Sequence, residues 1–136
     1  MEILKYSIAG LPSFVLYLLA SFVLLAVFLA VYLSITPYKE ITLIREGNTA
    51  AAASITGAML GFVIPLANAI IHSANLADMV MWGVIALIVQ SIVYAVVTRM
   101  IPRIASGIPE GKVAQGVFLG AVSVSTGILN AACITY

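Results

Sequence analysis

Four long apolar stretches dominate the chain, and polar residues gather in the short segments between them. The stretches are about Pro12 to Ile35, Thr49 to Ile71, Met79 to Thr98, and Val113 to Ile134. Each holds roughly twenty residues or more, and a helix rising about 1.5 Å per residue crosses a hydrocarbon core of about 30 Å with that length. Transmembrane strands would be shorter and would alternate polar and apolar residues. The pattern predicts an all-α membrane protein, with four transmembrane helices in one domain over residues 1–136.

The composition agrees with a lipid environment. Of the 136 residues 63% are hydrophobic and 8% are charged, whereas an ordinary soluble domain has about a quarter of its residues charged. The formal net charge of +1 argues against a nucleic-acid partner, because phosphate binding needs clustered Lys and Arg. One cysteine, Cys133, excludes an internal disulfide and any multi-cysteine metal site. We therefore predict the lipid bilayer as the surroundings of the protein, and no cofactor or metal.

Chemistry-bearing motifs are missing from the sequence. It has no glycine-rich phosphate loop, no HExxH motif and no Ser-His-Asp set with a placed nucleophile, so the chain is predicted not to be an enzyme. No Asp, Glu, Lys or His lies deep in any of the four stretches. Proton- and cation-coupled carriers usually need such a group, so a coupled transporter is disfavoured, although a passive channel is not.

The basic residues predict how the chain is oriented in the membrane. Five of the six bases fall in the loops after the first and third stretches, and only Lys5 lies on the other side; the five are Lys39, Arg45, Arg99, Arg103 and Lys112. The positive-inside rule places these loops in the cytoplasm and both termini outside, which in a Gram-negative cell is the periplasm. Tyr6, Trp82 and Tyr136 then lie near the outer boundary, as interfacial aromatic residues do.

Two segments of the chain are similar to each other. EGNTAAAASITGAMLGFVIPLANAI begins at Glu46, and EGKVAQGVFLGAVSVSTGILNAACI begins at Glu110. Each follows a helix, a Pro and a basic loop, so the chain divides into repeat one, about 12–71, and repeat two, about 79–134. Each unit crosses the membrane twice, so the two point the same way. This arrangement predicts a parallel repeat, related by an axis along the membrane normal.

Small residues recur at four-residue spacing in both copies of the repeated segment, at Ala53, Gly57, Gly61, Gly116 and Gly120. This small-xxx-small pattern lets two helix backbones approach closely in lipid. The two helices could pack against each other within one chain, which is the default, or against a second protomer.

Pro65 stands inside the second apolar stretch, where its ring predicts a helix kink. It leaves the carbonyl of Gly61 without its usual donor, and in lipid that carbonyl needs another partner. Asn68 lies one turn further on, and Asn130 holds the matching place in the second copy. Gln90 and Tyr94 share a face of the third stretch. These four polar residues could line a path for an ion or small solute, or they could be hydrogen-bond glue between helices, which is the more common use.

The first basic loop has the pattern of a short interfacial helix. Thr36 can cap it with Pro37 at its first position, and Tyr38, Ile41 and Ile44 then share one face. The loop's charged residues, Glu40 among them, fall mostly on the other side. Gly47 ends the helix, and Asn48 or Thr49 can cap the next transmembrane helix.

Several short motifs run from the end of the first apolar stretch to the C-terminus: ITPYKE from Ile35, NTAA from Asn48, LGFVIPLANA from Leu60, WGVIALIVQ from Trp82 and NAACITY from Asn130. With these motifs the chain resembles the YjfL-type family of small bacterial inner-membrane proteins, a domain of unknown function. The resemblance implies a four-helix inner-membrane protein. It also implies a link to envelope or membrane stress, because relatives often sit beside genes for phage-shock-type proteins. It supplies no activity and no site residues.

Two functional hypotheses follow. In the first, the protein is a non-enzymatic module that assembles as a homo-oligomer through its glycine faces. Its basic loops then meet a cytoplasmic membrane-stress protein or anionic lipid. In the second, it is a small channel or facilitator in which the Asn and Gln side chains line the path.

Overall fold

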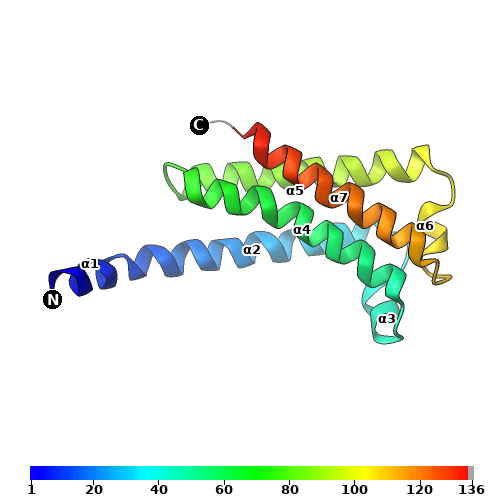
Figure 1. The fold of residues 1–136 in the computed structure, drawn as a ribbon, viewed down its shortest axis with the longest axis horizontal. Helices are drawn as coiled ribbons and strands as arrows, with labels where there is room; N and C mark the ends of the chain where they lie inside the picture. The colour runs from blue at the N-terminus through cyan, green and yellow to red at the C-terminus, as the bar shows by residue number, and fades with distance from the viewer. Residues whose placement is uncertain (135–136) are drawn as a thin grey trace.

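A computed structural model gives the fold, and it describes residues 1–134 (Figure 1). The helices are α1 (Glu2–Ala9), α2 (Leu11–Ile35), α3 (Glu40–Arg45), α4 (Thr49–His72), α5 (Leu76–Met100), α6 (Ile104–Gly107) and α7 (Val113–Cys133). Four of them, with α1 and α2 counted together, are long and apolar enough to cross a membrane. The predicted all-α class and the four spans are confirmed. Tyr136, assigned above to an interfacial belt, lies outside the described residues.

The four long helices alternate in direction. Helices α2 and α5 run toward the end of the bundle that holds α3 and α6, while α4 and α7 run away from it (Figure 1). We call this end the basic end, because the loops 36–48 and 101–112 lie there. The N-terminus and the end of α7 lie at the opposite end, which we call the terminal end. Helices α4 and α7 are thus parallel neighbours, and α4, α5 and α7 pack on one another.

Aromatic rings dock α2 on the rest of the bundle through its C-terminal half. Phe28 stacks on Phe62 of α4 with ring centroids 4.6 Å apart, and Tyr32 meets the edge of Tyr94 of α5 at 5.5 Å. Within α2 only Leu24, Phe28 and Tyr32 are buried. This half of α2 therefore has an inward face. The sequence did not indicate which side of α2 faces inward, because the residues on its other sides are equally apolar.

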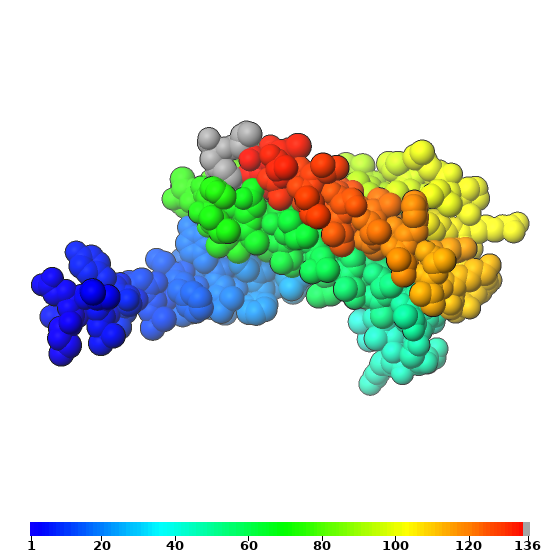
Figure 2. All heavy atoms as spheres, viewed as in Figure 1, coloured from blue at the N-terminus to red at the C-terminus, as the bar shows by residue number. Residues whose placement is uncertain are grey.

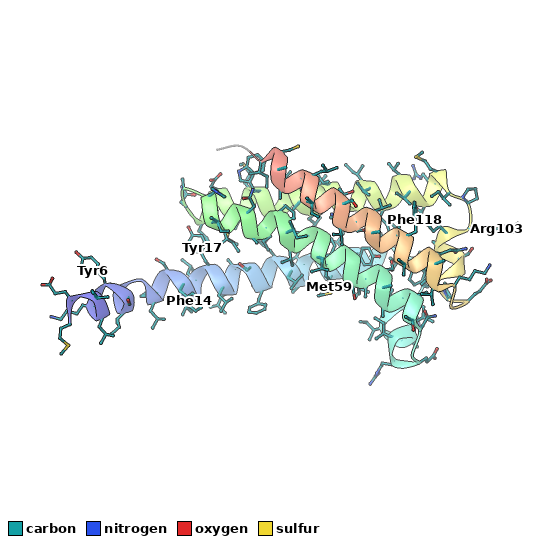
Figure 3. All side chains as sticks on the ribbon, viewed as in Figure 1. Tyr6, Phe14, Tyr17, Met59, Arg103 and Phe118 are labelled. Carbon is teal, nitrogen blue, oxygen red and sulfur yellow. The ribbon has the colours of Figure 1, made fainter. Side chains whose placement is uncertain are left out.

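The N-terminal part of the chain projects beyond the other helices at the terminal end (Figures 1 and 2). Helix α1 buries no residue, and Gly10 and Pro12 separate it from the main run of α2. Between α2 and the end of α4 lies a groove of about 450 Å³, lined by residues that include Phe14, Tyr17 and Ile70. Tyr17 points from α2 toward the end of α4, whereas Tyr6 points outward (Figure 3). The two helices are therefore splayed apart here.

The two loops at the basic end are tied together through Asn48. Its Oδ1 accepts a hydrogen bond from the backbone N–H of Ala51 at 2.9 Å, which caps α4. Its Nδ2 donates to the carbonyl oxygen of Ile108 at 2.9 Å, in the other loop. Gly47, with φ of 84°, ends α3 in a left-handed conformation that suits glycine. One side chain thus starts α4 and joins two segments 60 residues apart in the sequence.

Asn48→Ala should destabilise the protein more than Asn75→Ala, its matched control. Asn75 caps α5 through the N–H of Asp78 at 2.9 Å. A cap is worth about 1 kcal/mol, and a further hydrogen bond to a loop adds about 0.5–1.5 kcal/mol. We therefore expect Asn48→Ala to lower the free energy of unfolding by more than Asn75→Ala, and the excess reports the hydrogen bond to Ile108. Reversible unfolding in mixed detergent micelles measures both losses. Equal losses in the two variants would contradict a structural role for the Asn48–Ile108 bond.

Candidate functional site

Helices α4 and α7 meet along a seam of small residues. Gly57 lies against the backbone of Gly120, Gly116 against Ala50, and Gly127 against Gly61. In each pair one added Cβ would run into the opposite backbone. All of these residues are buried within the single chain. The seam therefore occupies both small-residue faces, with Ala53 contacting Gly120 on its edge, and a second protomer cannot use these faces.

Gln90 of α5 closes this seam from a third side. Its Nε2 donates to the carbonyl oxygen of Gly61 at 2.9 Å and to that of Ser123 at 3.0 Å. Pro65 lies inside α4 and cannot donate to the Gly61 carbonyl, so this oxygen takes its hydrogen bond from Gln90. Gln90 is 3% exposed, and its amide nitrogen binds α4 and α7 together.

The two asparagines lie nearer the terminal end. Asn68 of α4 donates through Nδ2 to the carbonyl oxygen of Ala131 in α7, at 2.8 Å. Nδ2 of Asn130 is buried and has no hydrogen-bond partner among residues 1–134. Asn68 and Gln90 thus both bond to backbone carbonyls of neighbouring helices. Hydrogen bonds of this kind hold transmembrane helices together.

Tyr94 belongs to a different cluster, at the basic end. Its ring meets Tyr32 of α2, whose hydroxyl lies 3.1 Å from Oγ of Ser54 in α4. The hydroxyl of Tyr38, from the linker before α3, interacts electrostatically with Tyr32, Tyr94 and Glu40. Five segments of the chain thus bring polar groups to one place. We call Tyr32, Tyr38, Glu40, Ser54 and Tyr94 the tyrosine–glutamate cluster.

Glu40 is the most unusual member of this cluster. Its side chain is 1% exposed, and neither carboxylate oxygen has a hydrogen-bond partner among the described residues. Helix α3 begins at Glu40 with Lys39 before it, so the predicted start at Thr36 and Pro37 is wrong. Thr36 is instead buried beside the cluster, and its hydroxyl donates to the carbonyl oxygen of Leu33 at 3.3 Å. Glu40, predicted to lie on the side of this helix away from its apolar face, is instead buried.

Burial sets the electrostatics of Glu40. Desolvation raises the pKa of its carboxyl to about 7, and the nearby Thr36 hydroxyl lowers it only in part. Desolvation likewise raises the pKa of Tyr38, and the charge of Glu40 is one of the smaller causes. Within residues 1–134 the ion pair present is that of Lys112 with Glu110, at 3.4 Å on the surface. No base therefore neutralises Glu40.

The five predicted loop bases all lie on the surface at the basic end: Lys39, Arg45, Arg99, Arg103 and Lys112. Arg103 stands at the corner between α5 and α6 in a left-handed conformation with φ of 68°, and its side chain points away from the bundle (Figure 3). A pocket of about 510 Å³ lies beside it, lined by residues that include Tyr38, Thr98 and Ser106. The five bases thus stay outside the buried interior.

Comparison with known proteins identifies the family of the chain. The family described as Domain of Unknown Function (DUF350) matches residues 6–134. The chain belongs to the DUF350 family. No solved structure matches the chain.

Curated relatives place this DUF350 chain among membrane proteins. The UPF0719 inner membrane protein YjfL of Escherichia coli (strain K12) is 38% identical over 127 residues, covering 93% of this chain and 96% of the relative. The UPF0719 transmembrane protein YshE of Bacillus subtilis (strain 168) is 32% identical over 79 residues, covering 58% of this chain and 59% of the relative. With its four apolar helices, the DUF350 chain is a multi-pass inner-membrane protein that lies in the lipid bilayer.

The sequence reasoning missed Tyr32, Ser54 as its partner, and the burial of Glu40. Tyr32 is one tyrosine inside a run of apolar residues, and its inward direction depends on how α2 docks. One signal was available. Tyr32, Tyr38 and Tyr94 all lie within a few residues of the helix ends at the basic end, where Glu40 is the nearest acid.

Proposed function

We propose that this DUF350 protein is a non-enzymatic membrane module linked to envelope or membrane stress, and that its basic end engages a cytoplasmic protein of that response. One observation carries the proposal. The interior amides of Asn68 and Gln90 are bonded to backbone carbonyls, while the five loop bases stand exposed on segments that Asn48 joins. The chain thus resembles a packed scaffold with a charged end. The stress link rests on the family resemblance.

Orientation and architecture belong to the same proposal. The five bases at one end favour that end as the cytoplasmic one, with both termini in the periplasm. The parallel run of α4 and α7 supports two repeats that point the same way. Homo-oligomers remain part of the proposal, but the contact must use lipid-facing surfaces such as those of α2, since the glycine faces are occupied.

A small channel or facilitator is the alternative, and no specific observation favours it. Gln90 is buried against two helix backbones, and α4 and α7 approach to glycine–glycine contact. A path along these residues would first have to break those bonds.

Site-specific photocrosslinking in cells tests the proposed partner surface. A photoreactive residue at Arg103, which is exposed at the basic end, should capture a cytoplasmic protein, and membrane stress should increase the yield at least several-fold. The matched control is the same residue at Lys5, which is exposed at the terminal end. Equal capture at the two positions, or capture at neither under stress, would contradict a partner at the basic end. Capture at Lys5 alone would reverse the proposed orientation.

A further inference from the structure

The tyrosine–glutamate cluster poses a problem of charge and of hydrogen bonding together. Both carboxylate oxygens of Glu40 and the hydroxyl oxygens of Tyr38 and Tyr94 are buried, and none makes a well-formed hydrogen bond within residues 1–134. The hydroxyls of Thr36 and Ser54 lie near Glu40 and Tyr38, and the Tyr38 and Tyr94 hydroxyls lie near each other, without completing such a bond. Buried polar groups are nearly always hydrogen-bonded, and a buried charge is paired or coordinates a metal. Four buried oxygens without a well-formed hydrogen bond in one cluster suit a ligand that accepts electron pairs from oxygen.

We propose that the tyrosine–glutamate cluster binds one monovalent metal cation, Na⁺ or K⁺, with the Glu40 carboxylate and the Tyr38 and Tyr94 hydroxyls as ligands. Hard cations take oxygen ligands, and neutral hydroxyl oxygens complete a shell in which one carboxylate supplies the charge. The proposal concerns a binding site and does not depend on the proposed partner function.

The charges around Glu40 favour a singly charged ion. The side chains that the packed segments bring near Glu40 carry hydroxyl groups and no basic group. They are Tyr32 of α2, Tyr38 of the linker, Ser54 of α4 and Tyr94 of α5. The neighbouring bases Lys39 and Arg45 are exposed and form no ion pair with it in the described part of the chain. No group of three His, Cys, Asp or Glu side chains that could hold a metal occurs among these residues, as a divalent site of the usual kind would need.

The site also has a route to the surface. A pocket of about 540 Å³ at the basic end is lined by residues that include Thr36, Tyr38 and Glu40. Tyr32 and Ser54 close the cluster on the inner side, where their hydroxyl oxygens lie 3.1 Å apart. An ion could thus enter from the aqueous side at the basic end and stop at the aromatic docking contact of α2. This is a dead-end site, because Tyr32 and Tyr94 pack ring against ring behind it.

Ion-dependent melting of the purified full chain tests the proposal. The starting buffer at pH 8 contains N-methylglucamine chloride, whose cation is too large for the site, and NaCl or KCl replaces it at constant ionic strength. Cation binding should raise the melting temperature by about 3–6 °C, following the linkage between binding and stability. Whichever salt acts at the lower concentration identifies the preferred ion. A melting temperature that neither salt moves would overturn the proposal.

The pH dependence follows from the raised pKa of Glu40. The fold favours the neutral acid, so without a bound cation the stability is greatest at or below pH 4.5 and falls as the pH rises to about 7. The effect of Na⁺ or K⁺ should therefore be present at pH 8 and absent at pH 5, where the carboxyl is protonated. A fall in melting temperature from pH 5 to pH 8 that neither salt reverses would identify the occupant as a proton and overturn the cation site.

Variants separate the site from general salt effects. Glu40→Gln should remove the response to Na⁺ and K⁺, and Glu46→Gln, which changes an exposed acid in the same loop, should retain it. Tyr38→Phe keeps the ring and removes one ligand, so the midpoint should move to several-fold higher concentration. If Glu40→Gln does not fold, the Tyr38→Phe variant tests whether the cluster binds the cation. A response that persists in Glu40→Gln, or an unchanged midpoint in Tyr38→Phe, would show that the cluster does not bind the ion.

Discussion

Gly57→Leu is expected to abolish the folded monomer, and Gly57→Ala is expected to cost at least about 3 kcal/mol. A Cβ at Gly57 would collide with the backbone of Gly120, and a backbone cannot rotate away as a side chain can. Overpacking in a core typically costs about 1–3 kcal/mol, and more where nothing can yield. A leucine there would force α4 and α7 apart along the whole seam. The loss would then approach the total stability of about 5–15 kcal/mol that a domain of this kind has.

Two other glycines provide a graded control. A Cβ at Gly10 would meet Ser7 at 3.6 Å, an ordinary contact, so Gly10→Ala should be near neutral. A Cβ at Gly83 would meet a methyl of Leu24 at 2.9 Å, which a side chain can partly relieve. Fluorescence-detected gel filtration after heating should show that Gly10→Ala is the most stable of the three alanine variants. Gly83→Ala should be intermediate, and Gly57→Ala should be the least stable. If the Gly57→Leu protein stays folded but elutes as a smaller assembly, the seam lies between protomers. That result would contradict packing of the seam within one chain.

Gln90→Leu should destabilise the protein by about 1–3 kcal/mol, because it leaves the Gly61 carbonyl buried without a donor. Ser91→Ala is the matched control in the same helix. The Ser91 hydroxyl donates to the carbonyl oxygen of Leu87 one turn back, so its loss should change the stability by no more than about 0.5 kcal/mol. Reversible unfolding in mixed micelles measures both.

Pro65→Ala makes the test specific, because it restores a backbone N–H that can donate to the Gly61 carbonyl within α4. The cost of Gln90→Leu should then fall by about 1 kcal/mol in the Pro65→Ala background, as a double-mutant cycle would show. Equal costs in the two backgrounds would mean that Gln90 stabilises the protein through packing or through Ser123, and not by replacing the donor that proline lacks.

The long helices were predictable from the sequence because lipid imposes one simple requirement, a run of apolar residues of sufficient length. The predicted stretch from Thr49 to Ile71 differs from α4 by one residue, and Val113 begins both the predicted and the observed last helix. The glycine spacing likewise indicated close helix contact. The glycine spacing did not show which helix each face would contact. A parallel helix of the same chain and a helix of a second protomer would both fit such a face.

The candidate ion site was not predictable in the same way. A six-residue helix such as α3 has too few residues for its periodicity to define an inward face. The burial of Glu40 depends on where the end of α2 places it, and this in turn depends on the aromatic docking of Phe28 and Tyr32. Gln90 and Tyr94 were predicted to share a face of their helix, and both are buried, yet they lie in different surroundings. Depth along the helix separates them, because Tyr94 is one turn closer to the basic end.

The splay of α2 from α4 gives the protein an uneven cross-section. Toward the basic end the aromatic contacts hold α2 against α4 and α5, whereas at the terminal end the groove beside Tyr17 separates α2 from the bundle. Acyl chains of one leaflet must fill that groove. The cross-section of the protein therefore differs between the two leaflets. A change in membrane curvature or lateral pressure should then shift the first helix relative to the bundle. Its effect would be transmitted to the aromatic contacts beside Glu40.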